Sequence, residues 1–309
     1  MTSAAAPATA SAARAAAARR AGILVALLGM LMFALNDVMG KWLVSTYSVG
    51  QILLLRSAAA LAVLAPILWR SRARLWPLER PWLQVARAAA STCEVYAFYY
   101  AVISLPLADV MTYWLAGPIY VAALSPWLLG EHVGPWRWTA ILIGFLGVVV
   151  ALRPGAEAVT PAVIVSLVGS AMFAFMMVSA RMLRGTADGA LVFWQTAAAL
   201  VGGVLTARVG WTTPGATDAV LLALLGVVAM LAHLCIARAL RLADAATVAP
   251  LQYTLLIWAI VFGWLIFGDL PEAAILAGAG LITASGLVIW LRETRASRAR
   301  RRTGSRAGA

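Results

Sequence analysis

Residues 29–43 read GMLMFALNDVMGKWL, and a related stretch returns in the second half of the chain, where residues 169–183 read GSAMFAFMMVSARML. The two stretches share six residues in register, and Arg181 stands where the first has Lys41. Each is an apolar segment of helical length with a cation near its end, which is typical of a membrane-spanning helix. We infer that the chain is a duplication whose repeated unit begins with a membrane helix.

Composition places the chain among multi-pass membrane proteins. Of its 309 residues, 63% are apolar and 12% are charged, which is more apolar surface than one soluble core could bury. The net charge of +12 could indicate nucleic-acid binding, but the cations lie in the tails and between apolar runs. Orientation in a lipid bilayer explains them, so no nucleic-acid partner is expected. Cys93 and Cys235 have no motif spacing and indicate neither a disulfide framework nor a zinc site.

Ten apolar runs have the length needed to cross about 30 Å of hydrocarbon. Their approximate limits are 21–43, 48–68, 82–104, 107–129, 136–152, 161–183, 189–209, 217–240, 245–267 and 273–291. The third run is interrupted by Arg87 and Glu94, and the fifth is short. The sequence predicts an all-α integral membrane protein with ten transmembrane helices.

The distribution of arginine predicts the orientation of these helices. With the N-terminus in the cytoplasm, the cytoplasmic side holds the arginines of both tails and of every second loop. The opposite side holds only Arg153, Arg208 and, at the end of the first span, Lys41. This bias favours a protein of the cell inner membrane with both termini in the cytoplasm. We interpret residues 1–20 as a disordered tail and residues 293–309 as a basic tail near anionic headgroups.

The repeat extends beyond its first helix. Residues 56–61, RSAAAL, match residues 195–200, QTAAAL. Each unit therefore has five helices, the first unit covering 21–153 and the second 161–292. Because five is odd, the second unit enters the membrane from the opposite side, and the repeats are inverted. Inverted repeats around a midplane site are typical of secondary transporters, since exchanging the conformations of the halves opens the site to alternate sides.

Four segments carry a family resemblance. They are LGE at 129–131, FGD at 267–269, and the Gly-rich runs ILIGFLGV at 141–148 and ILAGAGLITASGLVI at 275–289. With these segments the chain resembles the drug/metabolite transporter superfamily, in its EamA branch of ten-helix carriers. Residues 36–41 and the AATVAP stretch at 245–250 are similar to carriers of S-adenosylmethionine or riboflavin. The resemblance implies a central cavity lined by both halves and no shared catalytic or cofactor motif.

Ionisable residues inside hydrocarbon are costly and are therefore candidates for function. Asp37 and Lys41 are four residues apart on one helix, so an ion pair between them is geometrically easy; a gating or proton-linked role is the alternative. Asn36 falls on a different helix face from Asp37, so the two are not expected to face a cavity equally well. Arg56 lies within the second span, where Asp37 is its expected partner and a substrate anion is the alternative.

Glu94 is the deepest carboxylate, in the middle of the third span, and its approximate repeat mate in the eighth span is His233. Two titratable groups at related positions of inverted helices could meet near the midplane, where they would suit proton coupling. The alternative is that a neighbouring helix satisfies each of them separately. If Glu94 couples protons, the substitution Glu94→Gln abolishes pH-dependent transport and leaves folding intact.

Aromatic and amide side chains near these positions are candidates for substrate contact. They are Tyr96, Tyr113, Trp114, Gln252 and Tyr253. Rings with one polar edge suit a planar or amphipathic organic substrate, although packing between helices is their commoner use.

The sequence contains no HExxH, GxSxG or phosphate-binding glycine loop, and so predicts neither an enzyme nor an ATP-driven pump. The expected function is that of a secondary transporter that moves a small organic metabolite across the cytoplasmic membrane by alternating access. Protons are the coupling ion we consider, no cofactor or metal is expected, and the carrier acts as a monomer or a homodimer. The alternative is a membrane-embedded enzyme that uses Glu94 and His233 as acid and base.

Overall fold

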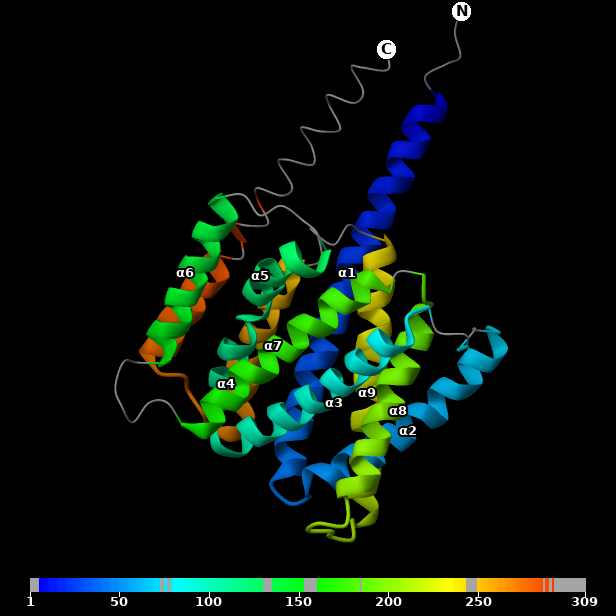
Figure 1. The fold of residues 1–309 in the computed structure, drawn as a ribbon, viewed down its shortest axis with the longest axis vertical. Coiled ribbons are helices and arrows are strands. Elements are labelled where there is room, and N and C mark those ends of the chain that lie inside the picture. Colours follow the sequence, from blue (N-terminus) through cyan, green and yellow to red (C-terminus); the bar gives the residue numbers. More distant parts are fainter. Residues whose placement is uncertain are drawn as a thin grey trace, which may run out of the picture.

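The computed structural model describes residues 6–72, 75–76, 79–129, 135–152, 160–183, 185–242, 249–285, 287–288 and 291. These residues form helices joined by short loops, and no strand occurs among them (Figure 1). The helices are α1 (Ala6–Val44), α2 (Val49–Arg70), α3 (Pro81–Ser104), α4 (Leu107–Trp114), α5 (Gly117–Leu129), α6 (Pro135–Leu152), α7 (Pro161–Met182), α8 (Asp188–Thr206), α9 (Ala216–Leu242), the 3₁₀ helix η1 (Ala249–Tyr253), α11 (Thr254–Phe262), the π-helix η2 (Gly263–Phe267) and an unlabelled last helix (Ala273–Ser285). The start of the ninth predicted span, at 245–248, and the basic tail at 293–309 lie outside the described residues.

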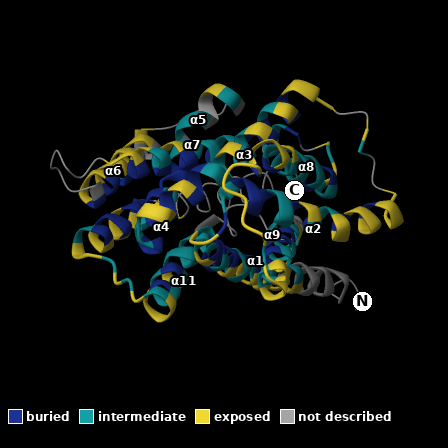
Figure 2. Cartoon of the chain, turned by 90° about the horizontal axis from the view of Figure 1, so that it is seen from below, coloured by how far each residue is buried: buried dark blue, intermediate teal, exposed yellow. Residues whose placement is uncertain are grey.

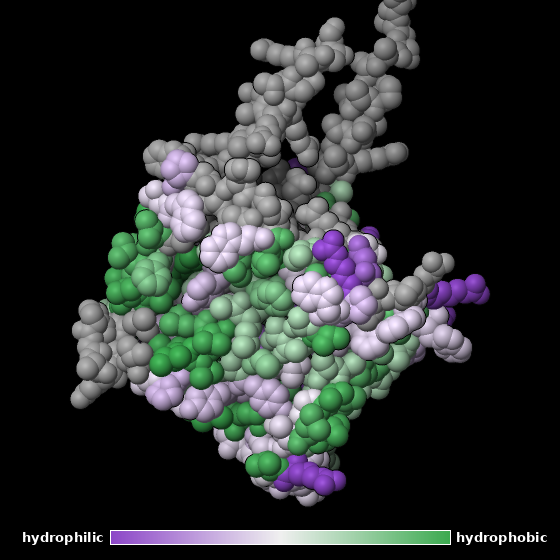
Figure 3. All heavy atoms as spheres, viewed as in Figure 1, coloured by the Kyte–Doolittle hydropathy of each residue, from purple (hydrophilic) through white to green (hydrophobic). Residues whose placement is uncertain are grey.

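The helices follow the predicted spans closely. Helix α1 begins at Ala6, ahead of residue 21 where the sequence places the first span, and its apolar part runs over Arg20–Val44. Within the described residues, five helices are long and apolar enough to cross a membrane, and three shorter apolar helices accompany them. Figure 3 shows hydrophobic side chains over a broad part of one face of the molecule. The chain is therefore an all-helical, multi-pass membrane protein.

The fourth span is not one continuous helix. Helix α4 ends at Trp114 and α5 begins at Gly117, with two residues between them. Pro118 has no backbone N–H to donate to the carbonyl oxygen of Trp114, which in a regular helix would be its acceptor. That carbonyl instead accepts a hydrogen bond of 3.1 Å from Ser170 Oγ of α7. The break is thus satisfied by the other repeat, as an irregular backbone inside a membrane protein requires.

The ninth span, as far as it is described, is also irregular. It runs through η1 and α11 into the π-turn η2, and Gly268 then ends it with a left-handed backbone at φ 72°. The N–H of Asp269 returns to the carbonyl oxygen of Gly263 at 3.1 Å. Glycine suits the left-handed position because it has no Cβ. This C-cap fixes the place of Asp269 directly behind the helix.

The two repeats interlock instead of lying side by side. Helix α1 packs along α9, α3 packs along α7, and α2 packs along α8 (Figure 1). Exchanging the two repeats turns the pair α1/α9 into the pair α7/α3 and turns α2/α8 into itself. The contacts therefore obey the pseudo-twofold relation that inverted repeats demand. Buried residues lie on the inward faces of these helices and exposed residues lie on the periphery (Figure 2).

Helix α6 and the last helix form a second self-related pair, away from the centre of the bundle. Their backbones touch at two glycines, because a Cβ added at Gly147 would lie 2.8 Å from the carbonyl oxygen of Gly278. A Cβ at Gly278 would in turn lie 2.5 Å from the carbonyl oxygen of Gly147. Small residues are what close helix packing in a membrane requires, since lipid provides no hydrophobic drive for association.

Candidate functional site

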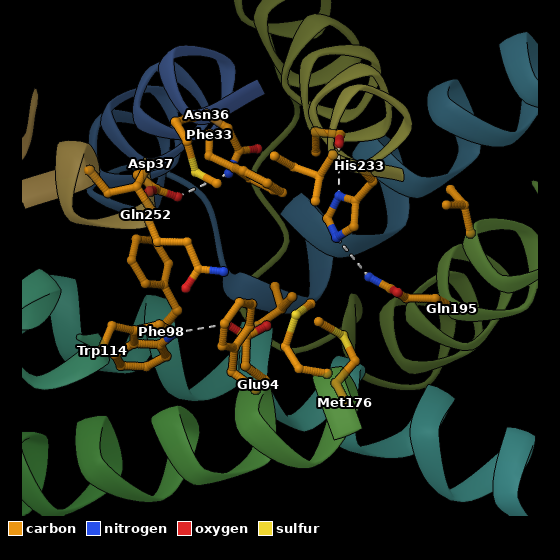
Figure 4. A pocket seen from close by; sticks show the side chains of 18 of the residues that line it. Phe33, Asn36, Asp37, Glu94, Phe98, Trp114, Met176, Gln195, His233 and Gln252 are labelled. Carbon is orange, nitrogen blue, oxygen red and sulfur yellow. Dashed lines mark hydrogen bonds between the residues drawn. The ribbon is translucent and has the colours of Figure 1, made fainter. Parts of the chain in front are cut away.

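A cavity of about 260 Å³ lies between the two repeats in the middle of the bundle. Side chains of α1, α2, α3, α4, α7, α8, α9, η1 and α11 line it (Figure 4). Its polar lining residues are Asn36, Asp37, Arg56, Arg87, Glu94, Trp114, Asp188, Gln195, His233 and Gln252. Both repeats contribute to this list, so the cavity is a joint product of the duplication.

The cavity lies asymmetrically along the bundle. We call the near end the one where α7 ends at Met182 and α8 begins at Asp188, and the far end the one where α1 ends at Val44 and α2 begins at Val49. Ala180 and Asp188 belong to the cavity lining, whereas the last seven residues of α1 and the first seven of α2 do not. The lining thus extends from the middle of the bundle to the near end.

Asn36 and Asp37 both line the cavity, and Asn36 Nδ2 donates to Asp37 Oδ1 at 3.1 Å. The two were not expected to face a cavity equally well, yet both line this one, because it borders a wide arc of α1 that also includes Met30 and Phe33. Asn36 is buried, and its Oδ1 has no hydrogen-bond partner among the described residues. One amide acceptor and one carboxylate therefore face the cavity together.

Lys41 is paired with Asp269 and not with Asp37. Its Nζ lies 2.8 Å from Asp269 Oδ2, and 4.7 Å from the centroid of the Phe267 ring. The pair joins the far end of α1 to the end of η2, outside the cavity lining. The local spacing allowed the predicted pair with Asp37, but the C-cap of the ninth span presents a carboxylate from the other repeat at closer range.

Arg56 also lacks its predicted partner Asp37. Its Nη1 donates to the hydroxyl oxygen of Tyr99 at 2.8 Å, and among the described residues it forms no ion pair with Asp37. Tyr99 is fully buried in the main apolar cluster, which anchors the guanidinium at the cavity wall. The backbone of Arg56 packs directly on Gly226 of α9, where a Cβ would overlap its carbonyl oxygen. This close approach brings α2 near enough for Arg56 to reach the cavity.

Glu94 accepts a hydrogen bond of 3.0 Å from Trp114 Nε1, and both side chains line the cavity (Figure 4). Trp114 is the last residue of α4, so the bond ties the middle of α3 to the break in the fourth span. Phe98, one turn beyond Glu94, packs edge-on against the Trp114 ring with centroids 5.7 Å apart. The carboxylate thus sits in an aromatic frame with a single neutral donor.

His233 faces the same cavity from α9 but is held by other partners. Its Nε2 lies 3.1 Å from Gln195 Nε2, and its Nδ1 lies 2.9 Å from the carbonyl oxygen of Ala229. No hydrogen bond joins His233 to Glu94 within the part of the chain that the structure describes, and Figure 4 shows them on different walls. Glu94 and His233 therefore share the cavity without forming a direct acid–base pair.

Three predicted contact residues lie outside the cavity lining. Tyr96 donates to the carbonyl oxygen of Gly202 at 3.0 Å and also bonds to Thr206, so it fastens α3 to α8. Tyr113 is buried in a small apolar cluster with α6 and α7, and Tyr253 packs against the cluster around Leu115. Their rings serve helix packing, which is the commoner use of such side chains.

The apolar part of the lining was not singled out from the sequence. It includes Phe33, Phe98, Phe173, Met30, Met111, Met176 and Met177. The repeat is the signal that could have found part of it, because Met176 and Met177 stand where the first repeat has Asn36 and Asp37. In the same way Gln195 stands opposite Arg56, and His233 opposite Glu94. Positions that are equivalent in the two repeats line the same cavity.

The described residues contain no group of three or more His, Cys, Asp or Glu side chains that could hold a metal ion. Asp37, Arg56, Glu94 and His233 are instead spread around the walls of the cavity, and each is hydrogen-bonded to a neutral partner. Such a lining suits contact with a small organic molecule through several separate groups.

Two inverted five-helix units around a shared polar cavity define a membrane transporter of small metabolites. The chain belongs to the EamA-like transporter family, whose model matches it twice, at residues 20–153 and 160–291. The two matches confirm the resemblance to the drug/metabolite transporter superfamily that the sequence segments indicated.

Individual relatives extend over nearly the whole chain. An S-adenosylmethionine uptake transporter of Rickettsia felis is 24% identical over 271 residues, 87% of this chain and 92% of its own. A riboflavin transporter of Rhizobium johnstonii is 24% identical over 281 residues, 90% of this chain and 93% of its own. A crystal structure with 15% sequence identity superposes with a TM-score of 0.63 and covers 89% of this chain and 98% of its own, which shows the shared fold.

Proposed function

We propose that the chain is a secondary transporter that moves a small organic metabolite across the cytoplasmic membrane by alternating access. The observation that carries this proposal is the position of the cavity, which reaches the near end of the bundle while contacts between the repeats close the far end. An alternating-access carrier needs this one-sided arrangement in each of its end states.

Three sets of polar contacts close the far end, each between one repeat and the other. Lys41 bonds to Asp269, as described above, and the hydroxyl of Tyr47 donates to Asp218 at 2.5 Å. That hydrogen bond raises the pKa of Tyr47, which keeps its hydroxyl protonated as a donor. Transport requires these contacts to break while equivalent ones form at the near end.

Gln51 supplies the third set. Its Nε2 donates to the carbonyl oxygen of Thr212 at 2.5 Å, and its Oε1 accepts from the Thr212 N–H at 3.0 Å. Gln51 is fully buried at the start of α2, and Thr212 lies in the loop before α9. A side chain that satisfies both backbone groups of one residue fixes that loop firmly, and it too must release when the far end opens.

Glu94 is the residue we assign to proton coupling. It is a carboxylate on the cavity wall with one neutral donor, so that protonation can change its interaction with a substrate without breaking an ion pair. His233 is less suited to this role, because Gln195 and Ala229 occupy both of its ring nitrogens. The separate partners of Glu94 and His233 also argue against the alternative in which they act as acid and base of one enzyme site.

Uptake into liposomes tests the transport proposal directly. The purified protein would be reconstituted and offered a panel of labelled solutes that includes S-adenosylmethionine, riboflavin, amino acids and aromatic amines, because two relatives are named for the first two. Saturable accumulation above that of protein-free liposomes is the expected result. Conversion of a solute without accumulation would contradict transport and favour the enzyme alternative.

A further inference from the structure

Arg87 of α3 is a buried cation on the cavity wall that has only neutral partners. Arg87 as a whole is only 5% exposed. Its Nη1 donates to the carbonyl oxygen of Leu191 at 3.4 Å, and its Nη2 donates to Gln195 Oε1 at 3.2 Å. Its Nε has no hydrogen-bond partner among the described residues. The guanidinium group, with five N–H donors, thus keeps buried donating capacity in reserve.

No carboxylate of the described residues neutralises Arg87. Among pairs whose two members are both described, Lys41 and Asp269 form an ion pair, and neither Asp188 nor another carboxylate forms one with Arg87. A cation held inside a membrane protein without an anion is costly, because neutral hydrogen bonds replace only part of its hydration. A carboxylate in the cavity would complete this site, and arginine is the side chain best suited to bind one.

The neighbours of Arg87 are arranged so that they cannot supply that anion. A guanidinium group only donates, so the atom of Gln195 that faces Arg87 is its carbonyl oxygen. The amide nitrogen of Gln195 therefore donates to His233 Nε2, and His233 Nδ1 carries its proton toward the carbonyl oxygen of Ala229. The donor and the acceptor of each hydrogen bond from Arg87 through Gln195 to His233 are thus fixed, and His233 at the end is neutral.

Two carboxyl groups that form no ion pair with a described residue face the same cavity deeper in the bundle. Asp37 accepts from Asn36, and Glu94 accepts from Trp114, so both carboxylates have neutral donors only. Arg87 and Glu94 are seven residues apart on α3 and project from the same face, about 10 Å apart along the helix axis. The cavity thus presents Arg87 at the near end and, further in, two carboxyl groups together with Arg56, with a stretch of aromatic and methionine side chains on its walls.

We propose that Arg87 binds the carboxylate of a zwitterionic substrate whose cationic group lies against Asp37 and Glu94. The charges of such a substrate are separated by several bonds, since the two subsites lie about two helical turns apart. This inference rests on the proposed transport function and adds the chemical class of its cargo. Arg87 is then the residue that distinguishes organic cations that carry a carboxylate from organic cations that lack one.

Matched probe pairs test the assignment. S-adenosylmethionine and arginine each carry a carboxylate several bonds away from a sulfonium or guanidinium group, and decarboxylated S-adenosylmethionine and agmatine are the same cations without the carboxylate. Each compound would be tested as a competitor and as a labelled substrate in liposome uptake, with riboflavin as a solute without a carboxylate. We expect at least one carboxylate-bearing probe to be taken up with an apparent KM about tenfold or more below that of its decarboxylated partner.

Three variants separate a binding role of Arg87 from a structural one. Arg87→Gln is expected to remove the preference within a probe pair by raising the KM of the carboxylate-bearing member alone. Gln195→Glu places a carboxylate against Arg87 within the protein, so it is expected to abolish the same preference while the variant remains folded. Arg70→Gln removes an exposed arginine from the end of α2 and is expected to leave the preference unchanged.

The outcomes distinguish this inference from the transport proposal. Equal uptake of both members of every pair, uptake of riboflavin alone, or a preference that persists in folded Arg87→Gln and Gln195→Glu would overturn the carboxylate site and leave transport standing. Uptake of no probe would overturn both. If Arg87→Gln does not fold, a folded Gln195→Glu protein decides the question by itself, because it retains the arginine.

Discussion

Lys41 Nζ and Asp269 Oδ2 lie 2.8 Å apart and connect two residues that are 228 positions apart in the sequence. The ion pair joins the first helix of one repeat to the ninth span of the other at the closed end of the cavity. Its energy is modest, because the two side chains are 13% and 35% exposed. A modest contact suits a closure that must open in every transport cycle.

Loss of this ion pair should favour opening of the far end. We expect Lys41→Met and Asp269→Asn each to lower the free energy of unfolding by no more than about 1 kcal/mol, because the pair is partly exposed. The double variant should cost no more than the larger single effect, since both remove one interaction. Thermal unfolding of the original protein, the two single variants and the double variant in detergent measures these differences. Additive losses would show that the two residues act separately.

Substitution of Glu94 tests proton coupling. Glu94→Gln keeps an oxygen acceptor for Trp114 Nε1, so we expect the fold to persist while the uptake rate loses its dependence on pH between about pH 5 and about pH 8. Uptake with and without an imposed proton gradient is the measurement. Glu79→Gln changes an exposed glutamate two residues before α3 and serves as the control. An unchanged pH profile in Glu94→Gln would remove Glu94 from the coupling mechanism.

Half-buried Gln195 and buried Gln84 should respond in opposite ways to replacement by leucine. Gln195→Leu removes the acceptor of Arg87 and the donor of His233, so we expect a loss of about 1 to 3 kcal/mol in the free energy of unfolding. Gln84→Leu should be neutral or stabilising, because neither amide atom of Gln84 has a partner among the described residues. Denaturant unfolding compares the two. Similar losses would contradict the bond network around Gln195.

The crossing of α6 and the last helix makes a third stability prediction. Gly278→Ala places a Cβ 2.5 Å from the carbonyl oxygen of Gly147, and the forced separation should cost about 1 to 3 kcal/mol. Gly280→Ala, two residues away, meets nothing within 4 Å and should stabilise the helix by up to about 1 kcal/mol. Opposite shifts in melting temperature are the expected result, and a tolerated Gly278→Ala would disprove the close contact.

The architecture was predictable because its signals are local or repetitive. Apolar run length predicts each span, and the match between residues 29–43 and 169–183 predicts a duplication, which is inverted because each unit has five helices. The division of the fourth span at Trp114 was harder to place. Pro118 indicates a break, but the acceptor that makes the break tolerable is Ser170, which lies in the other repeat.

The partners of the charged residues could not be predicted in the same way. The spacing of Asp37 and Lys41 favoured a local pair, whereas the actual partner of Lys41 lies behind the ninth span. The sequence also did not show that the side chains of Tyr96 and Tyr113 lie outside the cavity lining. In a membrane protein both the lipid-facing and the core-facing sides of a helix are apolar, so sequence periodicity does not tell which side points inward.

Equivalent positions of the two repeats carry different chemistry in the cavity. Asp37 and Glu94 of the first repeat correspond to Met177 and His233 of the second, and Arg56 corresponds to Gln195. Two copies of the first half alone would bring four carboxylates into one cavity, whereas two copies of the second would bring only two copies of Asp188. The two halves are therefore not interchangeable, and a symmetric pair of identical copies of either half would not form the same cavity.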